Sequence, residues 1–357
     1  MPASRRAAWP AVAVVALWLA GCELIPGVTV QSAVRPATMP PPATLAPATE
    51  TTAPERPTST AMLAPAIETA APERPTSTAI STAAAEAAEA AIPALIALSA
   101  GGRPINSYRL GHGTAAVVVV GGIHGGYEWN SILLAERLLA HYEAHPAQLP
   151  DGVSLHIIPN ANPDGLFAIL GFEGPFTPAD VPVADPIVYL PGRFNANGVD
   201  LNRNWDCQWT SAAQWRDRQV SGGPLAFSEP ETRGLRDFLP TLDPVVVVFL
   251  HSAANAVFIS GCGAPHPPSY EPASVYGRAA GYPVHELFDP YVITGDAGDW
   301  LTTQGIPSFS VELYSHESVD WEQNLAGIGA LLAHYAQQPA TPIAAPTAVA
   351  PTPKVTP

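Results

Sequence analysis

One stretch constrains the fold of this chain more than any other: a run of valines over residues 117–120 that ends in glycines and then His124-Gly125-Gly126-Tyr127-Glu128. The valine run is β-branched and does not alternate with polar residues, which is typical of a strand covered on both faces of a parallel or mixed sheet. In open α/β sheets, ligands bind at the carboxyl ends of strands. His124 and Glu128 therefore stand where an α/β protein usually places its chemistry.

A nitrogen ligand and an oxygen ligand a few residues apart suit zinc. For this pair alone, two interpretations stay open. Either His124 and Glu128 bind a metal, or His124 forms a hydrogen bond within a loop while Glu128 begins a helix expected over residues 131–141.

A second valine-rich strand, residues 245–250, delivers His251 at its carboxyl end. Together His124, Glu128 and His251 form a set of two histidines and one carboxylate. Such a set leaves one zinc position open to water, which is typical of catalytic rather than structural zinc. The alternative is that His251 is a histidine of the core.

Glu312 lies within the apolar stretch 307–313, where an unpaired carboxylate would be costly. It is either a general base beside a metal-bound water or one partner of a structural ion pair with an arginine. Residues 198–205 are rich in side chains that form hydrogen bonds of fixed geometry. In this segment Arg203 can hold a carboxylate with two hydrogen bonds and Asn202 can add a donor, while Arg193 lies shortly before.

Strand and helix patterns alternate between residues 92 and 338. We expect strands at residues 117–120, 153–158, 245–250 and 307–313, and helices at 131–141, 229–238 and 325–335. Residues 159–165 are interpreted as a turn. The order predicts an α/β fold, a single domain with a mixed, mostly parallel β-sheet flanked by helices.

The two ends of the chain have a different composition. Residues 1–22 have the basic start, the short apolar core and the Leu19-Ala20-Gly21-Cys22 ending of a signal segment. That ending resembles the lipobox of bacterial lipoproteins, which would place a lipid on Cys22; an ordinary cleaved signal is the alternative. Residues 23–91 are a Pro/Ala/Thr-rich linker with an internal repeat, and residues 339–357 are a similar tail; both are expected to be disordered.

The net charge is −15 with a single lysine, Lys354, so we expect neither nucleic-acid binding nor attraction to an anionic bilayer. We expect a monomer held at the extracytoplasmic face of a bacterial membrane by its lipid. In that compartment a disulfide can persist. Cys207 and Cys262 are either bridged or two buried thiols.

Several of these segments resemble, in the same order, the zinc carboxypeptidases of the carboxypeptidase A type. The likeness covers nearly all of residues 105–335 and rests on six segments: His124 to Glu128, Asn162-Pro163-Asp164-Gly165, Gly198 to Trp205, His251-Ser252, Asp299-Trp300 and Val311-Glu312-Leu313. One departure is that three residues, not two, separate His124 from Glu128.

The resemblance implies a role for each matching residue. It makes His124, Glu128 and His251 the ligands of one zinc ion and Glu312 the catalytic glutamate. Arg193 would polarise the scissile carbonyl. The remaining positions are those of the family's substrate-binding residues: Asn202 and Arg203 for the terminal carboxylate, and Tyr291 as the mobile tyrosine.

The resemblance predicts hydrolysis of the C-terminal peptide bond of peptides with a free terminal carboxylate. Gly298 falls where the family lines its side-chain pocket, so we expect a roomy, uncharged wall there. Asp296 either pairs with a basic side chain, including the amine of diaminopimelate, or caps a turn. The alternatives are a murein peptide amidase or related cell-wall hydrolase, and a catalytically dead peptide-binding lipoprotein.

Overall fold

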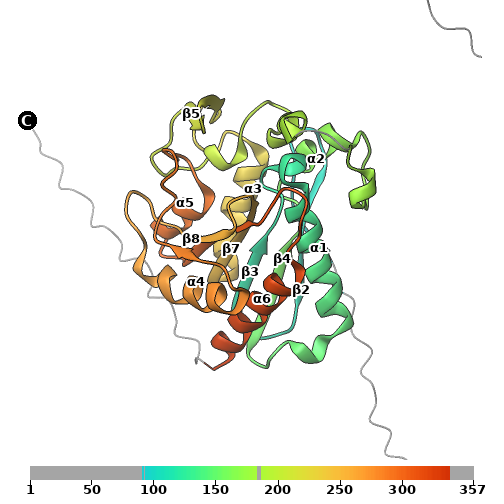
Figure 1. Ribbon diagram of the computed structural model, residues 1–357, viewed down its shortest axis with the longest axis vertical. Helices are drawn as coiled ribbons and strands as arrows, with labels where there is room; N and C mark the ends of the chain where they lie inside the picture. The colour runs from blue at the N-terminus through green and yellow to red at the C-terminus, as the bar shows by residue number, and fades with distance from the viewer. Residues whose placement is uncertain (1–90, 92, 183–185, 338–357) are drawn as a thin grey trace, which may run out of the picture. The chain divides into compact units, whose positions relative to one another are not determined.

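The computed structural model describes residue 91 and residues 93–182 and 186–337, which are organised on an eight-stranded sheet (Figure 1). The strand order is β1-β2-β4-β3-β7-β10-β8-β9, and four of the seven neighbouring pairs are parallel. The predicted mixed, mostly parallel sheet is confirmed. The strands are β1 (Pro93–Leu98), β2 (Pro104–Leu110), β3 (Ala115–Val120), β4 (Val153–Ile158), β7 (Pro244–Ser252), β8 (Ala256–Ile259), β9 (Val284–His285) and β10 (Ser308–Leu313). A separate hairpin pairs β5 (Ala212–Trp215) with β6 (Arg218–Ser221).

Helices cover both faces of the sheet (Figure 1). Val117 and Val119 of β3 pack in one hydrophobic cluster with α1 (Trp129–Ala144), α4 (Pro267–Ala280) and α6 (Trp321–Ala336). Val118 and Val120 pack in a second cluster with α3 (Pro230–Phe238) and α5 (Ala297–Thr303). The unbroken valine run is therefore buried on both sides, as its lack of alternation indicated.

Most predicted elements are present, and the differences have local causes. Residues 163–170 form helix α2 (Pro163–Leu170) where a turn was expected. The motif is a helix start, because Asn162 is the N-cap and accepts a hydrogen bond from the Gly165 amide at 2.9 Å, with Pro163 in the first turn. Helix α4 was not expected either, since its sequence begins with two prolines and carries Pro272.

The predicted signal segment 1–22 with Cys22, residues 23–90 of the predicted linker, and the tail 339–357 lie outside the described residues. Within the described ranges, no helix is both long and apolar enough to span a membrane.

The sheet brings three strand ends together. β3, β7 and β10 are consecutive and parallel, with Val120 opposite Phe249 and His251 opposite Glu312. Since carboxyl ends of parallel strands meet at one edge, the residues that follow β3 and those that end β7 and β10 converge there.

Candidate metal centre and substrate cleft

Two glycines shape the turn that follows β3. Gly122 and Gly125 have φ angles of +65° and +45°, and residues Gly125–Glu128 form a short 3-10 helix. A Cβ atom on Gly125 would lie 2.7 Å from the carbonyl oxygen of Gly192, so this position has no room for a side chain. The turn absorbs the extra residue between His124 and Glu128 and leaves both side chains on the same site.

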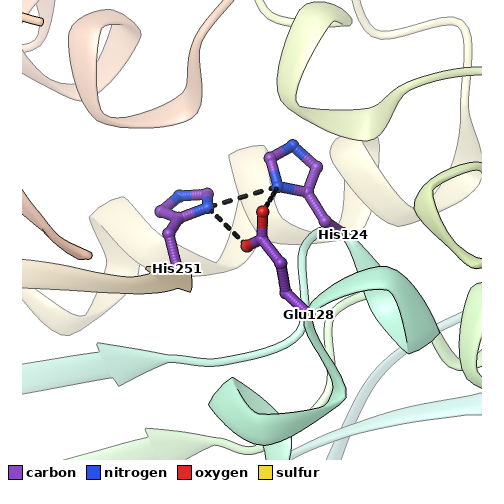
Figure 2. A group of neighbouring side chains, drawn as sticks. All are labelled: His124, Glu128 and His251. Atoms are coloured by element: carbon purple, nitrogen blue, oxygen red, sulfur yellow. Dashed lines mark hydrogen bonds and ion pairs between the residues drawn. The ribbon is translucent and has the colours of Figure 1, made fainter. Parts of the chain in front are cut away.

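His124, Glu128 and His251 point toward one another (Figure 2). Nδ1 of His124 lies 2.8 Å from Oε1 of Glu128, and Nδ1 of His251 lies 3.0 Å from Oε2 of Glu128 and 3.3 Å from Nδ1 of His124. All three side chains are buried. Ligands of a tetrahedral zinc ion with bonds of about 2.0 Å lie about 3.3 Å apart, so this donor set and spacing fit zinc.

The charge state of Glu128 suits a metal ligand. Burial by itself raises the pKa of this carboxyl, but the adjacent imidazoles of His124 and His251 outweigh it and hold the pKa well below the usual range. The carboxylate is therefore ionised at neutral pH, as metal binding requires.

Asp200 faces the ring nitrogen of His124 that points away from Glu128. Nε2 of His124 is buried without a hydrogen-bond partner of good geometry, and Oδ1 of Asp200 lies 3.5 Å from it. The fully buried Asp200 accepts hydrogen bonds from Nε of Arg193 at 2.7 Å and from the backbone N–H of Asn202 at 3.1 Å. Burial raises the pKa of Asp200, yet Arg193 and His124 bring it well below the usual range. A carboxylate behind a ligating histidine orients its ring.

Arg193 lies beside the cluster and is held from two sides. Its guanidinium pairs with Asp200, and its Nη1 lies 4.0 Å from Oε1 of Glu128. Its backbone carbonyl accepts a hydrogen bond from Nδ2 of Asn162 at 3.3 Å. The N-cap of α2 thus also anchors Arg193, which is the structural use of the Asn162-Pro163-Asp164-Gly165 segment.

Glu312 is the second acidic group at this edge of the sheet. It lies opposite His251 in the parallel β7–β10 ladder. Burial raises its pKa to about 7, with the neighbouring His251 acting in the opposite direction. No ion pair to Glu312 occurs among the described residues, so the arginine pair considered from the sequence is not formed. A carboxyl with a pKa near 7 can exchange protons at neutral pH.

Arg203 is a buried cation, only 1 % exposed, that is oriented by neutral partners. Its Nε donates to the Gln214 carbonyl at 3.0 Å and its Nη1 to the Asn202 carbonyl at 2.6 Å. Within the described part of the chain it forms no ion pair. Burying an unpaired charge is costly, so this arrangement favours an anionic ligand.

These side chains line a single cleft of about 990 Å³. The residues predicted from the sequence that line it are His124, Glu128, Arg193, Asn202, Arg203, His251, Tyr291, Asp296 and Glu312. The Tyr291 ring packs edge-on against Phe288 with centroids 4.9 Å apart, and burial raises the pKa of its phenol. Tyr291 therefore forms part of the cleft wall.

The side-chain end of the cleft differs from the sequence expectation. Asp296 is the N-cap of α5, since its Oδ1 accepts from the Asp299 amide at 3.0 Å, and its Oδ2 accepts from Nδ2 of Asn202 at 2.7 Å. The capping role is thus realised, and both oxygens are engaged. Gly298 does not line the cleft; it leaves room for Ser260, whose Oγ would lie 2.4 Å from an added Cβ.

Asp299 is the acidic residue of this region that the sequence interpretation gave no role. It lines the cleft and accepts a hydrogen bond from the Gly261 amide at 2.7 Å. Burial, followed by the charge of Asp296, raises its pKa to about 8. A cationic group entering the cleft would restore the ionised form of Asp299.

Cys207 and Cys262 form a disulfide, with Cα atoms 5.7 Å apart. Cys207 follows the Arg203 segment and its carbonyl accepts from the Gly295 amide at 2.7 Å. Cys262 follows Gly261, which holds Asp299. The bridge therefore joins two walls of the cleft and resolves the alternative left open by the sequence.

A family model described as zinc carboxypeptidase matches residues 80–328, well over half of the chain. The chain belongs to the zinc carboxypeptidase family. Members are zinc-dependent hydrolases of peptides, which agrees with the donor set of His124, Glu128 and His251.

The relatives of this family member include both carboxypeptidases and a murein peptide amidase. A zinc carboxypeptidase from Simulium vittatum is 27 % identical over 236 residues, 59 % of this chain and 75 % of the relative. Murein peptide amidase A from Escherichia coli (strain K12) is 41 % identical over 69 residues, 16 % of this chain and 28 % of the relative. Among solved structures, bovine thrombin-activatable fibrinolysis inhibitor in complex with tick carboxypeptidase inhibitor has a TM-score of 0.53 at 18 % identity, covering 70 % of this chain and 89 % of that one. This last likeness concerns the fold.

Sequence reasoning missed Asp200 and Asp299 for the same reason: their roles depend on residues distant in the chain. Asp200 faces His124, and Asp299 meets Gly261. A signal for Asp200 was present, because it is an acidic residue between Val199 and Leu201 just before Asn202. An acidic residue at such an apolar position needs a buried partner.

Proposed function

We propose that the chain is a zinc-dependent carboxypeptidase that hydrolyses the C-terminal peptide bond of peptides. One observation carries the proposal. The buried Arg203, which has no carboxylate partner among the described residues, lines the same cleft as the metal-binding cluster and Glu312. A site with this arrangement favours a peptide whose terminal carboxylate supplies the missing negative charge.

Substrate binding follows from the groups that line the cleft. Arg203 would hold the terminal carboxylate in an ion pair with two hydrogen bonds. Asn202 is fixed beside it by Asp296 and by the Ala297 amide, which donates to its Oδ1 at 3.0 Å. Tyr291 would cover the bound residue from the wall of the cleft. A substrate without a free carboxylate would leave Arg203 unpaired, a loss of about 1–3 kcal/mol.

The chemical step uses Glu312 and Arg193. His124, Glu128 and His251 would hold one zinc ion, which supplies a Lewis acid and lowers the pKa of bound water toward about 7. Glu312, whose pKa is about 7, takes a proton as water attacks the scissile carbonyl, and later returns it to the leaving amine. Arg193 stabilises the negative charge that develops on the carbonyl oxygen.

Zinc analysis combined with peptide hydrolysis tests this proposal. The purified protein should bind about one zinc per chain and release the last residue of blocked dipeptides ending in Phe, Leu, Arg or Lys. Glu312→Gln should retain zinc and lose about 10²- to 10⁴-fold in kcat. The same dipeptides with an amidated C-terminus serve as the control and should be poor substrates. Equal cleavage of free and amidated peptides would refute the assigned role of Arg203.

A murein peptide amidase activity is the second candidate. The 69-residue similarity to murein peptide amidase A favours it, as does Asp299, which would pair with the side-chain amine of diaminopimelate. Parallel assays on cell-wall peptides and ordinary dipeptides separate the two candidates. Turnover of cell-wall peptides alone would replace the carboxypeptidase assignment, and zinc binding without any turnover would favour a peptide-binding protein on a dead scaffold.

We also propose that the protein is exported and anchored to a bacterial membrane through a lipid on Cys22. The basic start, the short apolar core and the Leu19-Ala20-Gly21-Cys22 ending support this. Metabolic labelling with a radioactive fatty acid should mark the wild type and fail to mark Cys22→Ser. Labelling of both proteins would contradict the proposal.

A further inference from the structure

Three guanidinium groups line the cleft, and one of them has no assigned role. Arg193 pairs with Asp200, and Arg203 is the proposed partner of the terminal carboxylate. The third, Arg216, lies in the turn between β5 and β6 and is exposed. No ion pair to Arg216 occurs in the described ranges, although the neighbouring Asp217 also lines the cleft.

The β5–β6 hairpin places Arg216 relative to the other two arginines. The Gln214 carbonyl accepts from Nε of Arg203, and the Trp215 ring lies 4.9 Å from Cζ of Arg193. Arg216 follows Trp215 in the tight turn that closes the hairpin, where its φ is +54°. Gln214 thus contacts Arg203, Trp215 contacts Arg193, and the next residue supplies the third guanidinium, which also lies over the Trp215 ring.

This order matches the order of a bound peptide. Under the proposed function, Arg203 marks the terminal carboxylate and Arg193 the scissile carbonyl. Arg216 shares the Trp215 ring with Arg193 and not with Arg203, which places it on the amino-terminal side of the scissile bond.

Aromatic rings hold this side of the cleft in place. Trp215 packs edge-on against Tyr127 at 5.4 Å, and Tyr127 packs against His316 at 4.8 Å. The guanidinium of Arg216 lies over the Trp215 ring, with Cζ 5.1 Å from its centroid. Burial raises the pKa of Tyr127 and the charge of Arg216 lowers it, so that charge acts near the phenol.

A small residue lines the same cleft as these rings. Ala253, which follows His251 and Ser252, also lines the cleft and carries only a methyl group. Tyr127 directly precedes Glu128, and Tyr127 and Trp215 line the same cleft as the metal-binding cluster. An exposed guanidinium supported by Trp215 is a good partner for a planar carboxylate.

We infer that Arg216, Tyr127 and Trp215 form a subsite for a carboxylate carried by the residue on the amino-terminal side of the scissile bond. The inference rests on the proposed function, because that function sets the direction of the peptide. Two substrates carry such a group. One is an α-linked peptide with Glu at this position, and the other is a γ-linked glutamate with a free α-carboxylate.

The test measures kcat/KM for blocked dipeptides that share the C-terminal residue. Their preceding residue is α-linked Glu, α-linked Gln or γ-linked Glu. The wild type should prefer one of the two Glu substrates over Gln by about fivefold, as expected for an exposed ion pair, and the preferred one identifies the source of the carboxylate. The preference should shrink at high salt, because salt screens exposed charges.

Variants assign the preference to Arg216. Arg216→Gln should bring the Glu-to-Gln ratio to about one, and Arg216→Glu should reverse the preference, so that the Gln dipeptide becomes the better substrate. Arg218→Gln, in the same hairpin but outside the cleft lining, is the matched control and should keep the wild-type ratio. A ratio near one in the wild type, or an equal effect of both Gln variants, would overturn the inference.

Calorimetric binding to Glu312→Gln separates this inference from the proposed function. That variant should bind the preferred Glu dipeptide more tightly than the Gln dipeptide without cleaving either. Hydrolysis of all dipeptides with no Glu preference would leave the carboxypeptidase activity standing and refute the subsite. Absence of both binding and hydrolysis would refute the proposed function and the subsite together.

Discussion

Removal of the disulfide should destabilise the fold by an amount set by the length of the loop that the bridge closes. Cys207 and Cys262 are 55 residues apart, and a loop of this size loses closure entropy worth about 4 kcal/mol at 25 °C when cross-linked. The double variant Cys207→Ala/Cys262→Ala should therefore unfold at a Tm roughly 10 °C lower, since 1 kcal/mol corresponds to a few degrees in a domain of this size.

Chemical denaturation and thermal melting, each with and without reductant, measure this effect. The wild type should lose stability on reduction, while the double variant should be insensitive to reductant. The bridge also joins the Arg203 segment to the loop that holds Asp299, so the variant should show a raised KM in addition. A double variant within about 1 kcal/mol of the wild type would refute the loop-entropy reasoning for this bridge.

Three further predictions concern single residues of the site. Asp299 binds its proton more tightly in the folded state, with a pKa of about 8, so the free energy of unfolding of the wild type should fall as the pH rises from about 4 to 8, by at most about 1.4 kcal/mol per pH unit. Asp299→Asn should flatten this pH dependence, and a wild type that is equally stable at pH 5 and pH 8.5 would contradict the prediction. Gly125→Ala should lower the free energy of unfolding by about 3 kcal/mol and displace Glu128, because the new Cβ would meet backbone atoms. The control Gly171→Ala, with open space around it at φ +75°, should lower it by about 1 kcal/mol, and equal losses in urea denaturation would contradict the prediction. Asp200→Asn should weaken zinc binding about 10- to 100-fold in competition with a chromophoric chelator, and unchanged affinity would show that Asp200 does not support His124.

The sequence was most informative where a local pattern determines the structure. The valine runs before His124 and His251 have no polar residue on either face, so they could only be covered on both sides, and that determines the α/β class. A histidine directly after such a strand lies at the edge where ligands bind. The metal-binding candidates could therefore be named before any contact was known.

Local pattern was less informative where partners are far apart in the chain. Asn162-Pro163 has the composition of a turn as well as of a helix start, and only the structure shows that Asn162 caps α2 and also donates to the Arg193 backbone, 31 residues away. Asp296 was open between pocket and cap because only one of its oxygens has a local partner, the Asp299 amide, while the other accepts from Asn202, 94 residues away. Gly298 was expected in the pocket wall, but its neighbour Ser260 fills that space.

The sequence by itself determined the class of fold, the order of its elements and the residue types of a zinc site, because hydrophobic periodicity and short motifs are properties of neighbouring residues. Only the tertiary structure decided that Glu128 reaches the two histidines despite the extra residue, that Cys207 and Cys262 are bridged, and that Arg203 has no carboxylate partner among the described residues. These facts depend on the backbone path through glycine turns and on the distances between strand ends. Such distances are set by the packing of the whole sheet, which no local segment contains.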